Sequence, residues 1–593
     1  MKLKGTPTGR VLRNIRHGGH VIAPTEEVEE RTLEEMGGAE AAGDGTPVAD
    51  AAAELAKVDE SVTVLESTTF EVIDDEEFFE GTTRFDYVFS DLITDENYAD
   101  SHLPTDTAAD VVAALNALGE AMVEQDQNAA DQNSPIPAIY TYWGQFIDHD
   151  LTANTDRDAE ISDITPTDLQ ALDPEHVRTN LRNLRQPALN LDAVYGDGPT
   201  FPGNPRTDAA DLYNGPKFIL GQIDTGPQSP GVLIPPDDDL QRDLPRRDRA
   251  ALIGDGRNDE NLIIAQFHLA FLRFHNAVVD WVRDNEPQHS DDAQVFDRAR
   301  QLTEWHYQWL IVNDYLKTVA KRGVVEDVLA NGDPRFAPRD GDVFMPLEFS
   351  VAAFRFGHSM VRGSYDHNRN FGKPGLNVLP TAGFNFMFQF TGDGGLGGGQ
   401  TLPFNWVIEW DRFVDKGSLD PDHFARTIDT FLAPPLAQMR NQGAGLDPND
   451  PDQARLRDLL KHLARRNLLR GYHLSIPTGQ AVAEQLGVTV LDKDDLADDG
   501  TDIKTVMEQA GLLDKTPLWY YVLREAEAQE RGKTLGELGS RLISETIIGQ
   551  VRYDSTSYLR QEHPWSPDLG VTLPDGSAIT SISDFLRFAG VLA

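Results

Sequence analysis

Hydrophobic residues recur at helical spacing along most of the chain beyond residue 107. This spacing predicts helices over 108–124, 139–151, 261–283 and 299–320. The third helix is strongly amphipathic, with apolar side chains at Leu262, Ile263, Phe267, Phe271, Phe274 and Val278. Aromatic residues alternate with others over 384–390, which predicts a short strand, and further strand signals are sparse. The pattern therefore predicts a mainly α fold.

The first part of the chain lacks this pattern. Residues 1 to about 75 are rich in Glu, Ala, Gly and Thr and poor in aromatics, which predicts a mostly disordered leader. Aromatic residues become frequent from Phe70, so we expect residues 76–593 to form the folded part. A length of 593 residues allows two to four domains or one large helical unit. The glycine-rich run 392–397 precedes no predicted helix, so we interpret it as a mobile loop rather than a phosphate site.

The formal net charge of the chain is −45, and acidic residues extend along its whole length. A field of this sign repels nucleic acid and anionic lipid, so neither is an expected partner. An acidic disordered leader explains part of this charge, but the bias continues through the whole chain and favours a salt-adapted surface, because salt screens the repulsion between like charges.

The chain contains no cysteine. This excludes disulfides, thiolate ligation of iron and cysteine nucleophiles. We expect no membrane span, and the basic start of the chain has no apolar segment behind it that would indicate a secretory signal. The compartment, whether cytoplasmic or reached by an unrecognised export route, and the oligomeric state stay open.

Candidate chemistry begins in the segment 143–152. Gln145 and His149 are four residues apart and share one face of a helix, with Asp148 about 100° around the helix axis. Taken alone, a histidine flanked by acids is commonly a surface or capping residue, although imidazole is also the side chain that changes charge near neutral pH.

Three further segments carry polar residues that are weak signals individually. Arg257 and Glu260 precede the long amphipathic helix, where first-turn electrostatics would explain them equally well. His358 lies in an apolar setting, where a histidine is more often a core residue than a ligand. The basic residues of 463–472 are typical of a helix surface. No zinc-ligand cluster occurs, and the helical histidines are interpreted as structural: His268, His275 and His306.

Taken together and in this order, the four segments resemble the animal haem peroxidase superfamily, which includes the cyclooxygenases. The markers are GQFIDHD, the Arg257 segment followed by HLAFLRFHN, then FRFGH, then Asn467 with Arg470. The resemblance spans roughly residues 80 to 590. It implies that residues 76–593 form a mainly α, animal haem peroxidase-like domain with few short strands and with haem b as its cofactor.

The resemblance gives the first two segments catalytic roles. His149 would take a proton from the near oxygen of hydrogen peroxide and return it to the departing oxygen. Arg257 would stabilise the charge that develops on that departing oxygen. Gln145 would hold water, peroxide or a halide over the open position of the iron.

The last two segments would hold the cofactor. His358 is implied as the proximal iron ligand, and Asn467 would accept its other ring proton and so fix the ring orientation. A neutral amide in this place should leave the iron comparatively oxidising. Arg355 and Arg470 would pair with the haem propionates.

Two carboxylates match those that family members esterify to haem methyl groups, namely Asp148 and Glu260. The resemblance therefore implies that haem ester links can form here. Where the myeloperoxidase branch places a methionine that bonds the haem vinyl group, this chain has Asn261, which excludes a sulfonium link.

The family often holds a calcium ion beside the helix that carries the distal histidine. The matching positions here are Asp150, Gln186, Ala188, Asn190 and Asp192. Gln186 and Asn190 stand where a threonine and an aspartate are usual, and Asp192 stands where a serine is usual. An amide in place of a carboxylate weakens binding of a hard cation, although Asp192 would restore the charge. Calcium is therefore a second expected cofactor.

The implied function is a haem peroxidase. Hydrogen peroxide would convert the haem to a ferryl–porphyrin radical, which then takes electrons from halides or small phenolic donors. A cyclooxygenase-like fatty-acid oxygenase is an alternative, but the tyrosine of that branch lies three residues before the proximal histidine, where this chain has Arg355. A non-catalytic adhesion or scaffold protein is a second alternative, and it would be expected to have lost one of the four segments, whereas none is lost.

Overall fold

A computed structural model gives the conformation of most of the chain. It describes residues 15–16, 20–21, 82–125, 132–156, 161, 163–202, 209–226, 239–332, 335–337, 343–372, 379–439, 442, 446–498, 501–563 and 565–593. The predicted leader, residues 1–75, therefore lies outside the described residues except for the short strands β1 (Ile15–Arg16) and β2 (His20–Val21), which pair antiparallel.

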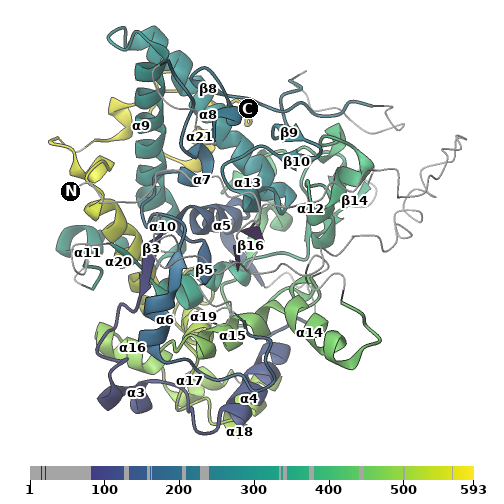
Figure 1. The fold of residues 1–593 in the computed structure, drawn as a ribbon, viewed down its shortest axis with the longest axis vertical. Coiled ribbons are helices and arrows are strands. Elements are labelled where there is room, and N and C mark those ends of the chain that lie inside the picture. Colours follow the sequence, from purple (N-terminus) through teal and green to yellow (C-terminus); the bar gives the residue numbers. More distant parts are fainter. Residues whose placement is uncertain are drawn as a thin grey trace, which may run out of the picture.

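Helices make up most of the described chain, which confirms the mainly α fold (Figure 1). The α-helices are α3 (Asp95–Ser101), α4 (Ala108–Ala121), α5 (Ile139–Leu151), α6 (Pro174–Asn180), α7 (Asp192–Tyr195), α8 (Leu262–Asn285), α9 (Asp292–Leu310), α10 (Leu316–Val319), α11 (Val324–Asn331), α12 (Phe384–Gln389), α13 (Asp411–Val414), α14 (Pro451–Lys461), α15 (Leu463–His473), α16 (Gly479–Leu486), α17 (Lys493–Ala497), α18 (Asp502–Gln509), α19 (Leu518–Glu530), α20 (Glu537–Tyr553) and α21 (Ile582–Phe588).

The strands are few and short. One sheet has four strands in the order β11 (Phe344–Pro346), β3 (Thr83–Asp86), β6 (Leu181–Asn183) and β5 (Asn154–Asp156), and only the β11–β3 pair is parallel. The remaining strands pair in twos: β4 (Asn133–Pro137) with β16 (Phe424–Arg426), β7 (Tyr213–Asn214) with β8 (Lys217–Phe218), β9 (Arg246–Arg247) with β10 (Ala250–Ala251), β12 (Ser364–Tyr365) with β15 (Ala382–Gly383), and β13 (Phe371–Gly372) with β14 (Leu379–Pro380).

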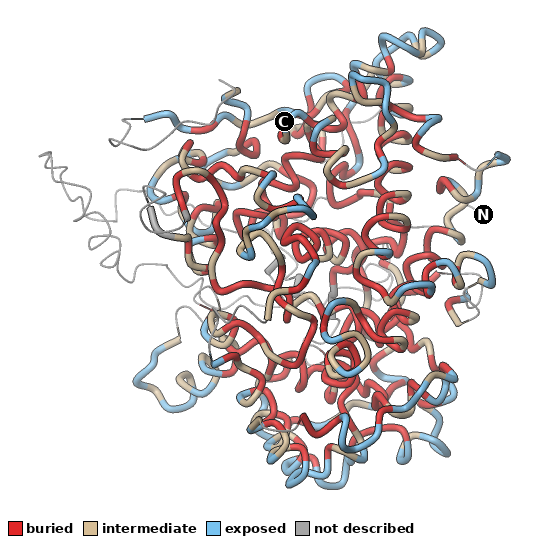
Figure 2. Tube along the Cα trace, turned by 180° about the vertical axis from the view of Figure 1, so that it is seen from behind, coloured by how far each residue is buried: buried red, intermediate tan, exposed pale blue. Residues whose placement is uncertain are grey.

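Helix α5 lies at the centre of the molecule, between the region of α8 and α9 and the region of α15 and α19 (Figure 1). Phe146 of α5 stacks on Phe271 of α8 with the ring centroids 4.4 Å apart, and Tyr307 of α9 contacts both rings edge-on. Buried segments fill the interior and exposed ones lie mostly at the periphery (Figure 2). Side chains on α5 are therefore held from within the core.

The predicted helices are present with shifted ends. The helix over 139–151 is confirmed as α5, and those over 108–124 and 261–283 as α4 and α8. The helix predicted over 299–320 begins earlier, at Asp292, where the Asp291 side chain caps it by accepting from Gln294 N at 2.9 Å. It continues through a π-helical turn, Ile311–Tyr315, into α10.

The strand predicted over 384–390 is wrong, because this segment forms helix α12. Phe384 and Phe388 are four residues apart, so a short alternation of aromatics fits one face of a helix as well as one face of a strand. Their rings contact each other with centroids 5.0 Å apart, and Met387 is buried. Phe386 points outward and is 40% exposed.

Helix α8 corrects the expectation that no segment is apolar enough to span a membrane. Among the described residues it passes by length and composition, with a mean hydropathy of 1.4 over an 18-residue window. In the fold 83% of that window is buried, so α8 has the surroundings of a core helix.

Candidate functional site

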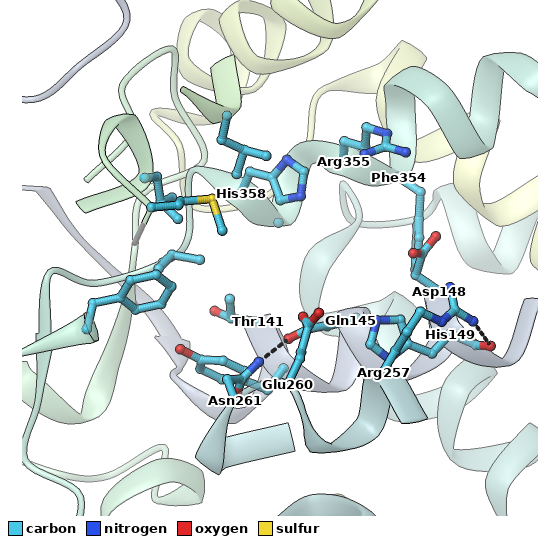
Figure 3. Close-up of a pocket in the computed structure, with 18 of the residues that line it drawn as sticks. Thr141, Gln145, Asp148, His149, Arg257, Glu260, Asn261, Phe354, Arg355 and His358 are labelled. Carbon is cyan, nitrogen blue, oxygen red and sulfur yellow. Dashed lines mark hydrogen bonds between the residues drawn. The ribbon is translucent and has the colours of Figure 1, made fainter. Parts of the chain in front are cut away.

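A cavity of about 1060 Å³, partly open to solvent, lies between α5 and the 3₁₀ helix η7 (Ala353–His358). His358 and Arg355 face it from one side, here named the His358 wall (Figure 3). Side chains of α5, together with Arg257, Glu260 and Asn261, face it from the other, here named the His149 wall. Apolar side chains complete the lining: Tyr142, Tyr315, Phe354, Val361, Phe384, Phe388, Leu436, Met439 and Leu463. The fold thus brings all four segments singled out by sequence to this cavity, the fourth through Leu463 and through the contact of Asn467 with His358.

The position of α5 depends on a glycine. A Cβ at Gly144 would lie 2.5 Å from the hydroxyl oxygen of Tyr315, far inside contact distance. The absence of a side chain lets α5 approach the helix that carries Tyr315, and this approach sets the depth of Gln145 and His149 beside the cavity.

His149 is buried, with 1% of its surface exposed, and its orientation is fixed by Asn258 of the 3₁₀ helix η4 (Gly256–Asp259). The His149 Nδ1–H donates to Asn258 Oδ1 at 2.8 Å, while Asn258 Nδ2 donates to His268 Nδ1 at 2.9 Å. An amide oxygen only accepts, so His149 carries its proton on Nδ1 and its lone pair on Nε2. Burial, and then the charge of Arg257, lower the pKa of His149 below its usual 6.5, so the ring is neutral at neutral pH.

Arg257 is held by Asp255, the N-cap residue of η4. Its Nη2 lies 2.7 Å from Asp255 Oδ2 and its Nε lies 3.1 Å from Asp255 Oδ1, and Nη2 also donates to the carbonyl of His149 at 2.9 Å. Burial opposes the charge of Asp255, but the guanidinium groups of Arg257 and Arg185 hold its pKa well below the usual range. A permanently charged arginine is therefore fixed beside the His149 ring.

Gln145 links α5 to the start of α8. Its Nε2 donates to Glu260, and its Oε1 accepts from Asn261 Nδ2 at 3.1 Å. Asn261 in turn caps α8 by accepting from Ile264 N at 3.0 Å. The carboxylates of Asp148 and Glu260 both line the cavity, and Asp148 accepts from Thr152 Oγ1 at 3.0 Å.

His358 closes η7, which follows directly on a π-helical turn, η6 (Glu348–Ala352). Asn467 of α15 contacts its ring, but Asn467 Nδ2 rather than Oδ1 lies 2.8 Å from His358 Nδ1. Asn467 Oδ1 instead faces Arg355 Nη1 at 3.5 Å. The partner is as predicted and the direction is reversed, so Asn467 accepts the ring proton only after its amide has turned over.

Arg355 lines the cavity, and burial lowers its pKa although the charge of Asp148 opposes this. Within the described residues no carboxylate forms an ion pair with it, and its Nε donates to the Ser350 carbonyl at 3.0 Å. A partly buried guanidinium of this kind fits an anionic ligand group.

Arg470, by contrast, is buried with 6% exposure and does not line the cavity. Its predicted contact with a haem propionate stays a prediction. Arg466 on the same helix is also buried, and its burial, followed by the charge of Arg355, lowers its pKa to about 10.

The predicted calcium ligands gather at the end of α5 and in the loop that follows β6. Burial, together with the charge of Asp192, raises the pKa of Asp150. The two amides bond to each other, with Asn190 Nδ2 donating to Gln186 Oε1 at 3.1 Å. Ala188 is buried beside them. These residues are close in space, and two of their buried carboxylate oxygens, Asp150 Oδ1 and Asp192 Oδ1, have no hydrogen-bond donor in the described chain.

Three residues of this region were not singled out by sequence: Asp255, Asn258 and Arg185. Asp255 and Asn258 flank Arg257. They lie in a polar run directly before an apolar helix, and this pattern could have identified them from the sequence. Arg185 had none, because a buried arginine has the same local sequence signature as an exposed one. His268, interpreted as structural, is linked to His149 through Asn258.

Comparisons with known proteins agree with this geometry. The sequence profile of the animal haem peroxidase family matches residues 93–382. A peroxidasin homologue of Caenorhabditis elegans is 23% identical over 441 residues, which is 65% of this chain and 31% of that protein. Eosinophil peroxidase of Mus musculus is 27% identical over 268 residues, 38% of this chain and 36% of that protein. The chain thus matches about a third of the length of these relatives.

Among solved structures, peroxidase A of Dictyostelium discoideum has the same overall fold. It superposes with a TM-score of 0.51 and 17% identity over 80% of this chain and 88% of that one. At this identity the likeness concerns the fold, and the chemistry rests on the cavity itself.

Proposed function

Because residues 93–382 of this chain belong to the animal haem peroxidase superfamily, we propose that the protein binds haem b in the cavity and reduces hydrogen peroxide at the expense of a small electron donor. The observation that carries the proposal is the pair of histidines across one cavity, with a fixed guanidinium beside one of them (Figure 3). A haem held here would supply the iron at which the peroxide bond is cleaved.

The lining of the cavity fits such a group. Ligand cavities of proteins are mostly apolar with a few placed polar groups, and this one combines apolar side chains with Gln145, Arg355 and the two histidines. His358 would bind the iron through Nε2, which requires the Asn467 amide to turn over. Arg355 would pair with a haem propionate, and this anionic partner would offset the cost of burying the guanidinium charge.

His149 would move the proton of hydrogen peroxide. A neutral imidazole with its lone pair on Nε2 accepts a proton from one peroxide oxygen and donates it to the other, so the leaving group departs as water. Asn258 keeps the Nδ1 proton in place and so holds the ring in the tautomer that this step needs. Arg257, fixed by Asp255, would stabilise the negative charge of the leaving oxygen.

The donor would enter along the apolar side of the cavity. Phe384 and Phe388 of α12, with Leu436 and Met439, form a wall that suits small phenolic compounds. Halides, which need only room beside Gln145, are the other donor class.

Asp148 and Glu260 would form ester links to the haem. Acid–acetone extraction tests this: the wild-type protein should retain the haem colour, whereas Asp148→Asn and Glu260→Gln should release more of it into the solvent.

The experiment that tests the function distinguishes the proposed roles of the two histidines. His358→Ala should lose the haem absorption band. His149→Ala should keep it and react with hydrogen peroxide about 10²–10⁴-fold more slowly, the usual contribution of a positioned acid–base group. His176→Ala, at an exposed position of α6, is the control. A His149→Ala protein with the wild-type peroxide rate, or purified protein that refuses haem, would exclude the proposal.

A fatty-acid oxygenase is the second candidate, because two tyrosines line the cavity. Tyr142 and Tyr315 are both buried there, and Tyr142 packs edge-on against Tyr365 with centroids 5.7 Å apart. The position expected for an oxygenase tyrosine holds Arg355, which makes this the weaker candidate. Oxygen uptake with a polyunsaturated fatty acid that disappears in Tyr315→Phe or Tyr142→Phe would favour it.

A further inference from the structure

The region expected to hold calcium already contains a buried positive charge. The Arg185 guanidinium is fully buried, with Nη1 3.4 Å from Asp192 Oδ1 and Nη2 2.5 Å from Asp255 Oδ2. Asp192 is one of the predicted calcium ligands. A side chain of this protein therefore supplies a cation to the same carboxylate that the metal would use.

The other predicted ligands do not form a calcium site. Gln186 Oε1 accepts from Asn190 Nδ2, and Asn190 Oδ1 accepts from Asp192 N at 3.2 Å. Asp150 Oδ2 accepts from Leu191 N at 3.2 Å, which leaves Asp150 Oδ1 as its one oxygen without a hydrogen-bond donor in the described chain. Asp192 Oδ1 is the second carboxylate oxygen here without a hydrogen-bond donor in the described chain, and it faces Arg185 Nη1 at 3.4 Å. Calcium takes about 6–8 oxygen ligands, so the two available carboxylate oxygens fall well short of that number.

The charges also argue against a metal. Asp192 and Asp255 share Arg185, and Asp255 also pairs with Arg257, so guanidinium and carboxylate groups alternate through the interior. Buried charges are retained when each has a partner. A dication bound at Asp192 would lie against the Arg185 guanidinium in a region of low dielectric constant, where like charges repel strongly.

We propose that Arg185 is a built-in cation that takes the place of calcium beside α5. Its charge neutralises Asp192, and through Asp255 it helps to hold Arg257 against the His149 carbonyl. Arg185 is thus a positioning residue, connected to the cavity by one carboxylate. The proposal concerns the ions that the folded chain needs, and it stands apart from the proposed peroxidase activity.

Whether the wild-type protein binds calcium can be measured directly. After treatment with a chelator, the protein is titrated with calcium while Tm is followed, and with terbium while luminescence sensitised by nearby tyrosines is followed. We expect no change of Tm and no saturable terbium signal that depends on Asp192. A rise of Tm with calcium that disappears in Asp192→Asn would overturn the proposal.

Two variants, measured in the presence of a chelator, test the role of the Arg185 charge. Arg185→Met should lower Tm by several degrees, because it leaves buried carboxylates without their cation, whereas Arg185→Lys should restore most of the loss. Arg283→Met, which removes an exposed ion pair with Asp292, is the control. Equal Tm values for Arg185→Met and wild type, or equal losses in the Met and Lys variants, would overturn the proposal. If Arg185→Met does not fold, Arg185→Lys and the wild-type titration still decide it.

Discussion

The His149 wall and the His358 wall differ in how far the protein alone fixes their polar groups. On the His149 wall, His149 is bound by Asn258, Arg257 by Asp255, and Gln145 by Asn261. On the His358 wall, Asn467 presents its amide nitrogen to His358, and Arg355 has no carboxylate partner in the described chain. The polar groups of the His149 wall are therefore preorganised, whereas under the proposed function those of the His358 wall would reach their final arrangement only with the bound group. Preorganised dipoles and charges are what accelerate a reaction.

The largest effect is expected from Asp255→Asn on the His149 wall. This change removes the carboxylate between Arg185 and Arg257 and leaves two buried guanidinium groups underpaired. Breaking a buried pair costs about 3–5 kcal/mol of the free energy of unfolding, which chemical denaturation measures. Asp280→Asn, which removes an exposed partner of Lys217, should cost at most about 1 kcal/mol. Similar losses in both variants would show that the His149 wall is not held by this pair.

The next effect concerns pH. Because only the neutral His149 ring accepts a proton, the rate constant for the reaction with peroxide should be level at neutral pH. It should fall as the pH drops through the His149 pKa, which lies below 6.5. Asn258→Asp places a carboxylate at Nδ1, which favours the imidazolium and should raise this pKa by about 1–3 units. The acid limb then moves to higher pH.

Stopped-flow rates across a pH series measure this limb. Asn285→Asp, at an exposed position at the end of α8, is the matched control. An unchanged limb in Asn258→Asp would mean that His149 is not the group that titrates.

The His358 wall should respond to the acceptor strength of residue 467. Asn467→Asp would accept the His358 ring proton more strongly and give the imidazole more anionic character, so the reduction potential of the bound haem should fall. Asn467→Leu removes the partner and should weaken haem binding about 10–100-fold. Potentiometric titration and haem titration measure the two effects. A potential unchanged by Asn467→Asp would show that residue 467 does not accept the His358 ring proton.

The smallest effect tests the packing behind the His149 wall. Gly144→Ala places a methyl group 2.5 Å from the Tyr315 hydroxyl and should cost about 1–3 kcal/mol, as overpacked core positions do. Tyr315→Phe in the same chain removes that oxygen and should recover part of the loss. Unaltered stability of Gly144→Ala in chemical denaturation would mean that α5 can shift without cost.

Much of the fold followed from hydrophobic spacing. Helix α5 was predicted to the residue, and α8 to within two residues, because long amphipathic patterns leave little choice. Segment 384–390 was predicted wrongly, since seven residues cannot distinguish a period of two from a helical face. The family resemblance identified His149, Arg257 and His358, and the fold places all three at one cavity.

The sequence by itself determined the helical class and the residue types available for the chemistry. Only the tertiary structure decided which way Asn467 faces, which tautomer His149 adopts and where the Arg185 charge resides. The reason is physical: hydrogen-bond direction and ion pairing depend on partners distant in sequence, and burial multiplies their strength. Hydrophobic periodicity, in contrast, depends only on residues that are close together along the chain, so the sequence alone reveals it.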